Sequence, residues 1–363
     1  MKALSHPPKK MATAVAMRYA RAGPIAHVLK REAVPVARLA RPTDALVKLL
    51  HAPLHRSDAS VINGTAAGRV YSAASAPPGV PQFNLGSFPR TGGAEGLGKV
   101  LDPGTAEGVK AGDLIWIPPM VGTGTWATHA VVDTSKAVIV DAETQKQLPL
   151  ELLSCATGLI TAHRLFSKTL PTALKSGDTI VQNAGSSLVS VAIAALAKAN
   201  GVTVITGANE ERLETARKVH AAFGSLVVSS DTKGAREAKA KMGGSAKARA
   251  FFNGSGGASF NAYLKLLADG GHCVTYGAQN GFGLMWSGSH HFWRDVTISG
   301  INTPRYLLGL TKEQRAAALR DAVVALSAAK FSFPIVAASL DQFEAAWDDT
   351  VREGGGRKRV LSL

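Results

Sequence analysis

The sequence predicts an α/β protein of two domains, in which an irregular β domain accompanies a doubly wound parallel sheet. Three observations predict this class. Residues 178–279 alternate short apolar strands with helices of about 10 to 15 residues, which favours right-handed crossovers and a parallel sheet. The first half carries short apolar runs bounded by Pro, Gly and Asp instead. A chain of 363 residues, 46% hydrophobic and 18% charged, is long enough for two cores.

The first half of the chain predicts strands and one long loop. Residues 44–54 (DALVKLLHAPL) and 113–119 (DLIWIPP) are short apolar runs, and residues 124–133 (GTWATHAVVD) alternate as a half-buried strand does. Residues 68–93 are rich in Pro, Gly and Ser and show weak periodicity. We therefore expect a loop there, of a length that usually carries function or mobility.

The middle of the chain predicts the parallel sheet. Strands are expected at 178–184, 202–207, 225–230 and 272–279, and helices at 187–200, 209–224 and 258–271. Gly201 closes the first helix in the position where glycine commonly ends helices. Asn209 is the expected N-cap of the second helix, which has acidic residues early, basic residues late and Gly224 at its end.

The C-terminal part returns to helix and strand. Residues 311–330 predict an amphipathic helix, residues 331–336 a strand, and residues 340–363 a helix followed by a final strand. Upstream, residues 233–250 hold six basic residues and one acidic residue. This stretch reads either as a patch for polyanions or as a solvated surface helix, and the second is the commoner case.

The charge balance is strongly basic, with 41 Lys and Arg against 26 Asp and Glu, a net charge of +15. Such a field favours polyanionic partners: RNA or a ribonucleoprotein, an anionic membrane surface, or an acidic carrier protein. The competing explanation is compartmental, because many mitochondrial matrix proteins are basic without binding RNA. Both readings stay open at this point.

The N-terminus indicates the compartment. Residues 1–31 contain seven basic residues and no acidic one, the composition of a mitochondrial transit segment. A strand pattern begins near Ala16, so the targeting segment is placed at residues 1–14 and a mitochondrial matrix protein is expected. Cys155 and Cys273 are too few for a disulfide framework or a four-thiolate zinc site. No apolar run approaches the roughly eighteen residues of a membrane-spanning helix.

Motifs along the chain resemble those of a known superfamily. HAPLHRSDASVING (51–64) is similar to a motif with an Asn-Pro-Ser-Asp core, GGAEGLGKV (92–100) to a Gly-x-Glu-Gly turn, and GTGTWATHAVV (122–132) to a Gly-Thr-Trp segment. TAHRLF, GDTIVQNAGSS, GGHCVTYG and RKRVLSL then follow in family order. From about residue 15 the chain resembles the medium-chain dehydrogenases/reductases, and within them the mitochondrial trans-2-enoyl-CoA/acyl-carrier-protein reductases.

This resemblance implies a fold and domain limits. It implies a GroES-like domain formed by residues 15–160 and 305–363 and a Rossmann-type dinucleotide-binding domain at 161–304. Zinc-dependent relatives place Cys at His55 or Arg56 and His in the turn that here reads Gly93-Ala94-Glu95, so the resemblance implies no metal. A homodimer paired through the nucleotide domain is also implied by the family alone.

The resemblance also implies site residues. Enoyl reduction needs a hydride from a nicotinamide, NADPH or NADH, and a donor for the enolate oxygen and the α-carbon. Family members carry a Tyr donor where this chain has Thr65 and Ala66, so Tyr71 is the candidate donor. Trp126 either lies near the acyl chain or packs the core of its domain. The residues expected around the cofactor are Asn183, Gly185, Ser186, Ser187, Arg212, Tyr276 and Gly277.

Two positions depart from the family. Leu188 and Ser190 replace the later glycines of the phosphate turn, where glycine admits the diphosphate, and the Leu188 side chain is expected to occupy its volume. After the second strand the chain reads Asn209-Glu210-Glu211 where NADPH-using relatives often place an Arg pair, which leaves Arg212 as the partner for a 2′-phosphate.

Three functional hypotheses follow. The first is an enoyl-thioester reductase acting on acyl-CoA or on an acidic acyl carrier protein. The second is a catalytically inert homologue that serves as a basic structural or RNA-contacting subunit of a mitochondrial assembly, such as a mitoribosome or a respiratory complex. The third is a quinone reductase on the same fold.

Overall fold

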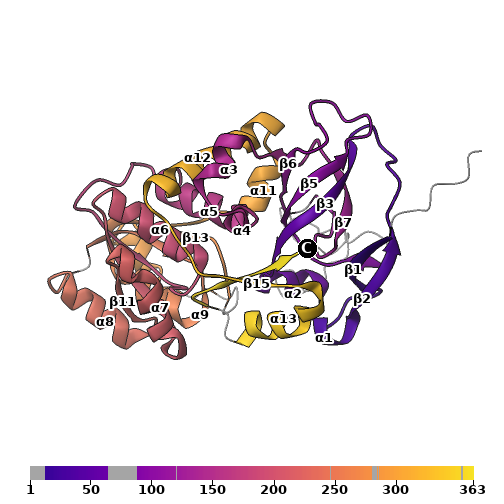
Figure 1. The fold of residues 1–363 in the computed structure, drawn as a ribbon. Helices are drawn as coiled ribbons and strands as arrows, with labels where there is room; N and C mark the ends of the chain where they lie inside the picture. Colours follow the sequence, from indigo (N-terminus) through magenta and orange to yellow (C-terminus); the bar gives the residue numbers. More distant parts are fainter. Residues whose placement is uncertain are drawn as a thin grey trace, which may run out of the picture. The chain divides into compact units, whose positions relative to one another are not determined.

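The computed structural model describes residues 13–63, 88–119, 121–245, 247–279, 284, 286–352 and 355–363. The chain forms two compact units (Figure 1). Unit 1 comprises residues 1–140, 337–344 and 361–363, and unit 2 comprises residues 141–336 and 345–360. The domain limits expected from the resemblance stay a prediction. Within the described ranges no helix is long and apolar enough to span a membrane.

Unit 2 is built on a six-stranded parallel sheet, which confirms the predicted doubly wound class. Its strands are β9 (Thr179–Gln182), β10 (Thr203–Ala208), β11 (Leu226–Ser229), β12 (Ala248–Asn253), β13 (Leu267–Thr275) and β14 (Thr297–Gly300). They lie in the order β11-β10-β9-β12-β13-β14, and all neighbouring pairs are parallel. Counted along the chain, this is the order 3-2-1-4-5-6 of a dinucleotide-binding sheet.

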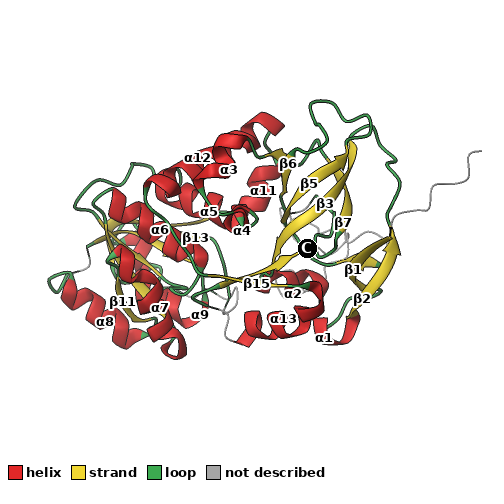
Figure 2. Ribbon diagram, in the orientation of Figure 1, coloured by secondary structure: helices red, strands yellow, loops and turns green. Residues whose placement is uncertain are grey.

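Helices cover this sheet because each crossover returns over one of its faces (Figure 2). They are α5 (Ala156–Ser167), α6 (Leu188–Ala199), α7 (Leu213–His220), α8 (Thr232–Lys241), α9 (Gly257–Leu264) and α12 (Lys312–Ala328). α5 packs against both α6 and α12, and α8 packs against α9. A buried cluster that includes Val181, Phe251 and Tyr263 fills the space between sheet and helices.

Two of the expected helices are shorter than predicted. Residues 209–224 form a 3-10 turn, Glu210–Arg212, then α7 and a second 3-10 turn, Ala221–Phe223. The Asn209 side chain makes no cap bond and instead accepts a hydrogen bond from the Ser230 hydroxyl. The helix expected to reach residue 271 ends at Leu264, because residues 267–275 join the sheet beside β12.

The irregular β structure consists of two sheets, and most of its strands belong to unit 1. A three-stranded sheet has the order β2-β1-β4, and a seven-stranded sheet has the order β15-β16-β3-β5-β6-β8 with β7 on β3. Their bounds are β1 (Thr13–Tyr19), β2 (Leu29–Pro35), β3 (Asp44–Pro53), β4 (Arg90–Thr91), β5 (Gly96–Asp102), β6 (Leu114–Ile117), β7 (His129–Asp133), β8 (Val138–Ile139), β15 (Ile335–Ala338) and β16 (Lys358–Ser362).

Short helices complete both units. They are α1 (Ile25–Val28), α2 (Arg56–Ile62), α3 (Ala142–Gln147), α4 (Leu150–Leu153), α10 (Ser289–Phe292), α11 (Thr303–Leu308) and α13 (Phe343–Arg352), with a 3-10 turn at Leu340–Gln342. The Thr311 hydroxyl and the Gln314 side chain form a capping box at the start of α12, the helix that the sequence predicts at residues 311–330.

Candidate functional site

The turn between β9 and α6 is the centre of the candidate site. It connects Gln182, the last residue of β9, to Leu188, the first residue of α6, at the carboxyl edge of the sheet. β9 and β12 flank the position where the strand order reverses. Ligands of open α/β sheets bind in the crevice at that position. The chain therefore places four of the expected cofactor residues, Asn183, Gly185, Ser186 and Ser187, at the edge where such a ligand would lie.

Gly185 is pressed against the second strand. Its N–H donates to the carbonyl of Gly207 at 3.0 Å. A Cβ atom at this position would lie 2.7 Å from Thr206 Cγ2 and 3.0 Å from the Gly207 oxygen. Because the first distance is shorter than side-chain carbons adopt, the turn can approach β10 only with glycine here. The close contact between Gly185 and β10 is thus a structural reason for glycine at this position of the turn.

Serine side chains close the turn and cap α6. The Ser187 hydroxyl accepts a hydrogen bond from the N–H of Ser190 at 3.2 Å, and the N–H of Ser187 donates to the Ala184 carbonyl at 2.9 Å. The fully buried Ser190 hydroxyl lies 3.1 Å from the Ala184 oxygen and 2.9 Å from the Ser187 oxygen. Where the family has glycine, Ser190 therefore fastens the turn rather than blocking it.

The start of α6 has the electrostatics of an anion site. The first N–H groups of a helix have no carbonyl partner within that helix, and here they are those of Leu188 and Val189. The helix dipole adds partial positive charge at the same end. These groups can bind a phosphate.

The expected obstruction by Leu188 is not supported. Its side chain is buried and packs toward α5, because a Cβ placed on Gly158 would lie 2.9 Å from Leu188 Cδ2. The glycine in α5 leaves room for the leucine at the first position of α6. The Leu188 side chain thus packs between α5 and α6 and does not fill the space where a diphosphate would bind.

Asn183 is placed at the site but its side chain is used inside the protein. Its amide nitrogen donates to Asn253 Oδ1 at 2.8 Å and to the Ser259 hydroxyl at 3.1 Å. Its oxygen accepts from the N–H groups of Gly254 and Ser255, at 2.6 Å and 3.1 Å. Asn183 is fully buried. It therefore joins the ends of β9 and β12 and shapes the crevice instead of offering a donor to a ligand.

Tyr276 and Gly277 follow directly after β13, the neighbour of β12 in the sheet. The Tyr276 ring lies over Gly254, where a Cβ would be 2.5 Å from the phenol oxygen. Burial raises the pKa of the Tyr276 hydroxyl, and the nearby Ser187 side chain opposes that rise. A Cβ on Gly277 would lie 2.7 Å from the Gly254 carbonyl. Both expected residues thus pack against Gly254, the residue that follows β12.

Arg212 follows β10, as the sequence predicts, but it has partners within the protein. Its guanidinium donates to the carbonyl of Arg352, the last residue of α13, at 3.3 Å. Glu211 lies 3.9 Å away, and only 15% of the Arg212 side chain is exposed. The Glu210 and Glu211 side chains are exposed to solvent.

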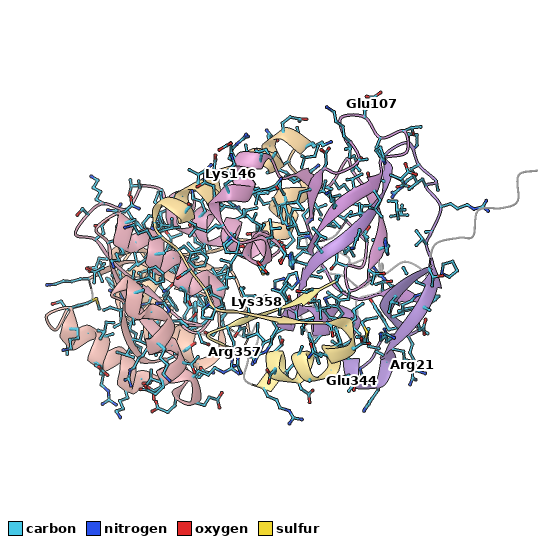
Figure 3. The ribbon with its side chains drawn as sticks, in the orientation of Figure 1. Arg21, Glu107, Lys146, Glu344, Arg357 and Lys358 are labelled. Atoms are coloured by element: carbon cyan, nitrogen blue, oxygen red, sulfur yellow. The ribbon has the colours of Figure 1, made fainter. Side chains whose placement is uncertain are left out.

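The sequence alone did not reveal that the C-terminal segment joins this site. The N–H of Gly356 donates to the Ser186 carbonyl at 2.7 Å. A Cβ on Gly355 would collide with the Ser186 hydroxyl, and one on Gly356 would collide with Thr215. Arg357 and Lys358 follow on the segment that enters β16 (Figure 3). The only sequence signal was the Gly-Gly-Gly run before these basic residues.

The residues expected in unit 1 are placed differently. Trp126 is completely buried, donates from its indole N–H to the Pro53 carbonyl at 3.3 Å and packs on Phe343 with ring centroids 4.9 Å apart. This is a core side chain, so the packing alternative describes Trp126 better than an acyl-chain contact. Tyr71, with Thr65 and Ala66, lies outside the described residues.

Sequence reasoning missed a buried ionisable pair in unit 1. His55 Nε2 lies 2.7 Å from Glu95 Oε1, and Glu95 is fully buried. The Trp116 indole N–H donates to the other Glu95 oxygen at 3.2 Å. The Glu95 carboxylate is thus held by two side chains. Across the described part of the chain no three His, Cys, Asp or Glu side chains converge as a metal site would require.

Comparisons of the sequence find similarity to oxidoreductases. A family model described as zinc-binding dehydrogenase matches residues 188–318. The mitochondrial enoyl-[acyl-carrier-protein] reductase of Dictyostelium discoideum is 26% identical over 361 residues, 98% of this chain and 96% of that protein. The protein of the same name from Homo sapiens is 29% identical over 297 residues, 78% of this chain and 71% of that protein.

Solved structures share the fold over almost the whole chain. A complex of Etr1p with NADP and crotonyl-CoA is 19% identical, with a TM-score of 0.76 and coverage of 97% of this chain and 100% of that one. The mitochondrial 2-enoyl thioester reductase Etr1p/Etr2p heterodimer from Candida tropicalis, 20% identical, has the same TM-score and coverage. A mycobacterial quinone oxidoreductase is 19% identical, with a TM-score of 0.76 over 96% of this chain and 100% of that one.

Proposed function

We propose that the chain is a mitochondrial enoyl-thioester reductase of the medium-chain dehydrogenase/reductase superfamily and that it uses NADPH. The observation that carries the proposal is the turn from Asn183 to Ser187. It lies at the reversal of a 3-2-1-4-5-6 sheet, and its glycine contacts β10 while α6 directs its first N–H groups to the same end. The relatives that match most of the chain carry the corresponding name.

The residues present fit a dinucleotide. The N-terminus of α6 and the backbone of the turn would hold the diphosphate, with Gly355 and Gly356 beside Ser186 as the neighbouring wall. The adenosine ribose of such cofactors lies at the end of the second strand, here β10. Among the residues that the structure describes, Arg212 is the basic residue nearest in sequence to that strand end, and it would face a 2′-phosphate. Structural neighbours are described with NADP, which favours NADPH over NADH. The bound cofactor would supply hydride.

The reaction that follows from this assignment is the reduction of a carbon–carbon double bond conjugated to a thioester. Hydride adds to the β-carbon, the electron pair of the double bond moves to the thioester oxygen, and a proton then reaches the α-carbon, giving the saturated thioester and oxidised cofactor. Donors at the oxygen stabilise the enolate. Tyr71 remains our candidate for the proton donor, as an inference from the family.

The substrate class and compartment follow from the same relatives. Acyl-CoA and acyl carrier protein thioesters are the proposed substrates, and the net charge of +15 suits an acidic carrier. The curated relatives are named as mitochondrial proteins. An RNA partner has no support beyond that charge. A quinone is the second candidate substrate, because quinone oxidoreductases share this fold at the same TM-score.

Titration and turnover test the proposal. Purified protein is titrated with NADPH and NADH while nicotinamide fluorescence is followed, and crotonyl-CoA or a benzoquinone is then added to the NADPH complex. We expect NADPH binding and crotonyl-CoA-dependent oxidation of the cofactor, lost in Tyr71→Phe. If neither nucleotide binds, the enzyme hypothesis is rejected in favour of the catalytically inert homologue. If NADPH is oxidised with the benzoquinone but not with crotonyl-CoA, the substrate is a quinone and not an enoyl thioester.

A further inference from the structure

A histidine outside the turn holds one of its peptide groups. His220 is the last residue of α7 and is completely buried. Its Nε2 lies 2.7 Å from the carbonyl oxygen of Gly185, and its Nδ1 lies 3.1 Å from the Ser225 hydroxyl. A carbonyl can only accept, so Nε2 carries the proton and donates to Gly185. Nδ1 then accepts from Ser225, which satisfies both ring nitrogens of a neutral imidazole.

The direction of this bond fixes a donor on the other side of the turn. The Gly185 carbonyl and the Ser186 N–H belong to one trans peptide group, and in such a group they point in opposite directions. Because the carbonyl points to the buried His220, the Ser186 N–H points away from it. Rotation of this peptide would replace a donor by an acceptor on that side.

The neighbouring peptides are also fixed, which leaves little freedom for compensation. The Gly185 N–H is bonded to Gly207, and the Ser187 N–H is bonded to Ala184. The Ser186 carbonyl accepts from Gly356. The Ser190 hydroxyl holds the carbonyls of Ala184 and Ser187, and His220 holds the carbonyl of the Gly185–Ser186 peptide between them.

We propose that His220 is a positioning residue of the cofactor site: by holding the Gly185 carbonyl it directs the Ser186 N–H toward the diphosphate of the nicotinamide cofactor. This inference rests on the proposed function. In the family, the later glycines of the phosphate turn let backbone N–H groups approach the diphosphate, but this chain has Leu188 and Ser190 at those positions. The hydrogen bond from His220 orients one such N–H group instead. His220 touches neither cofactor nor substrate.

The imidazole stays neutral at physiological pH. Burial lowers the pKa of His220 to about 4, and the bond to Gly185 works against that shift. Charged side chains also occur on α7, which carries His220, and on the neighbouring α6. Lys198 of α6 donates to the Ala222 carbonyl, and Glu214, Arg217 and Lys218 of α7 are exposed to solvent. The neutral state keeps a single Nε2–H donor for Gly185 and preserves the tautomer.

Two substitutions at this position and one control test the role. His220→Gln keeps an N–H that can reach the Gly185 carbonyl, His220→Asn is too short to do so, and Lys218→Leu alters an exposed residue of the same helix. The protein is labelled with ¹⁵N-serine, and the Ser186 N–H signal is followed during titration with inorganic pyrophosphate and with NADPH. The KM for NADPH and kcat are measured in parallel.

We expect a downfield shift of the Ser186 N–H in the wild type, His220→Gln and Lys218→Leu. In His220→Asn we expect the shift to be lost and the KM for NADPH to rise about tenfold, the value of one charge-assisted hydrogen bond, with kcat at saturation retained. Wild-type affinity and shift in a folded His220→Asn, or failure of Gln to restore them, would overturn the inference. If the wild type binds pyrophosphate at Ser186 but no nucleotide, the proposed function fails, and what survives of the inference is that His220 positions the Ser186 N–H for a diphosphate anion.

Discussion

Substituting Gly185 by Ala tests whether the close approach of the turn to β10 defines the site. The φ angle of Gly185 is not among the positive values in this chain, so alanine meets no backbone strain there. What it meets is Thr206 Cγ2 at 2.7 Å and the Gly207 oxygen at 3.0 Å. The change is therefore a purely steric probe of one contact.

The magnitude follows from those two distances. A methyl group forced into a packed contact destabilises a protein by about 1 to 3 kcal/mol. We expect a loss of free energy of unfolding in that range for Gly185→Ala, and weaker NADPH binding because the turn must move away from β10. Gly288→Ala is the matched control, since nothing lies within 4 Å of a Cβ at that position. We expect no loss there.

A second substitution separates the two contacts. Thr206→Ser removes the Cγ2 methyl but keeps the hydroxyl that accepts from Gln182 Nε2 at 2.9 Å. In the double variant Gly185→Ala with Thr206→Ser we expect part of the stability to return, measured as a coupling energy in urea unfolding. The reasoning is refuted if Gly185→Ala is as stable as the wild type, or if Thr206→Ser gives no coupling.

Three further predictions follow from buried groups at the site. The pKa of His220 is lowered from an ordinary value near 6.5 to about 4 in the folded protein, so its full contribution to the free energy of unfolding is present above about pH 6.5 and about 3 kcal/mol is lost as the pH falls toward 4. In His220→Gln the free energy of unfolding, measured with urea, should depend less on pH in this range. An unchanged pH dependence would contradict the assignment. Leu188→Gly should lower stability by about 2 to 5 kcal/mol without strengthening NADPH binding, because the leucine fills the contact with Gly158; tighter binding in titration would restore the obstruction argument. Asn183→Leu should cost about 3 kcal/mol or more, because the N–H groups of Gly254 and Ser255 lose a buried acceptor, and a thermal midpoint equal to that of the wild type would refute this account.

Local patterns in the sequence were sufficient for the class of fold. The helix closed by Gly201 and the amphipathic helix that begins after Thr311 were predicted, because caps and apolar periodicity act over a few residues. The helix expected to reach residue 271 was wrong in its second half. Residues 267–271 belong to β13, because pairing with β12 outweighs local propensity.

The roles expected for individual side chains stay predictions, but their burial did not follow from the sequence, for a physical reason. Asn183 and Trp126 were predicted near ligands by their position in family motifs. Both are fully buried, and their polar groups are bonded to other parts of the protein. A motif gives the place of a residue along the chain, whereas the burial of its side chain depends on segments tens or hundreds of residues away.

The sequence by itself determined the order of strands and helices, the turn at residues 183–187 and the basic character of the chain. Only the tertiary structure decided how that turn is held: Leu188 packs on α5, Gly356 bonds Ser186, and His220 fixes the Gly185 carbonyl. Periodicity and capping are encoded within single segments. Hydrogen bonds such as those of His220 and Gly356 join segments that become neighbours only when the chain folds, so their partners cannot be inferred from spacing.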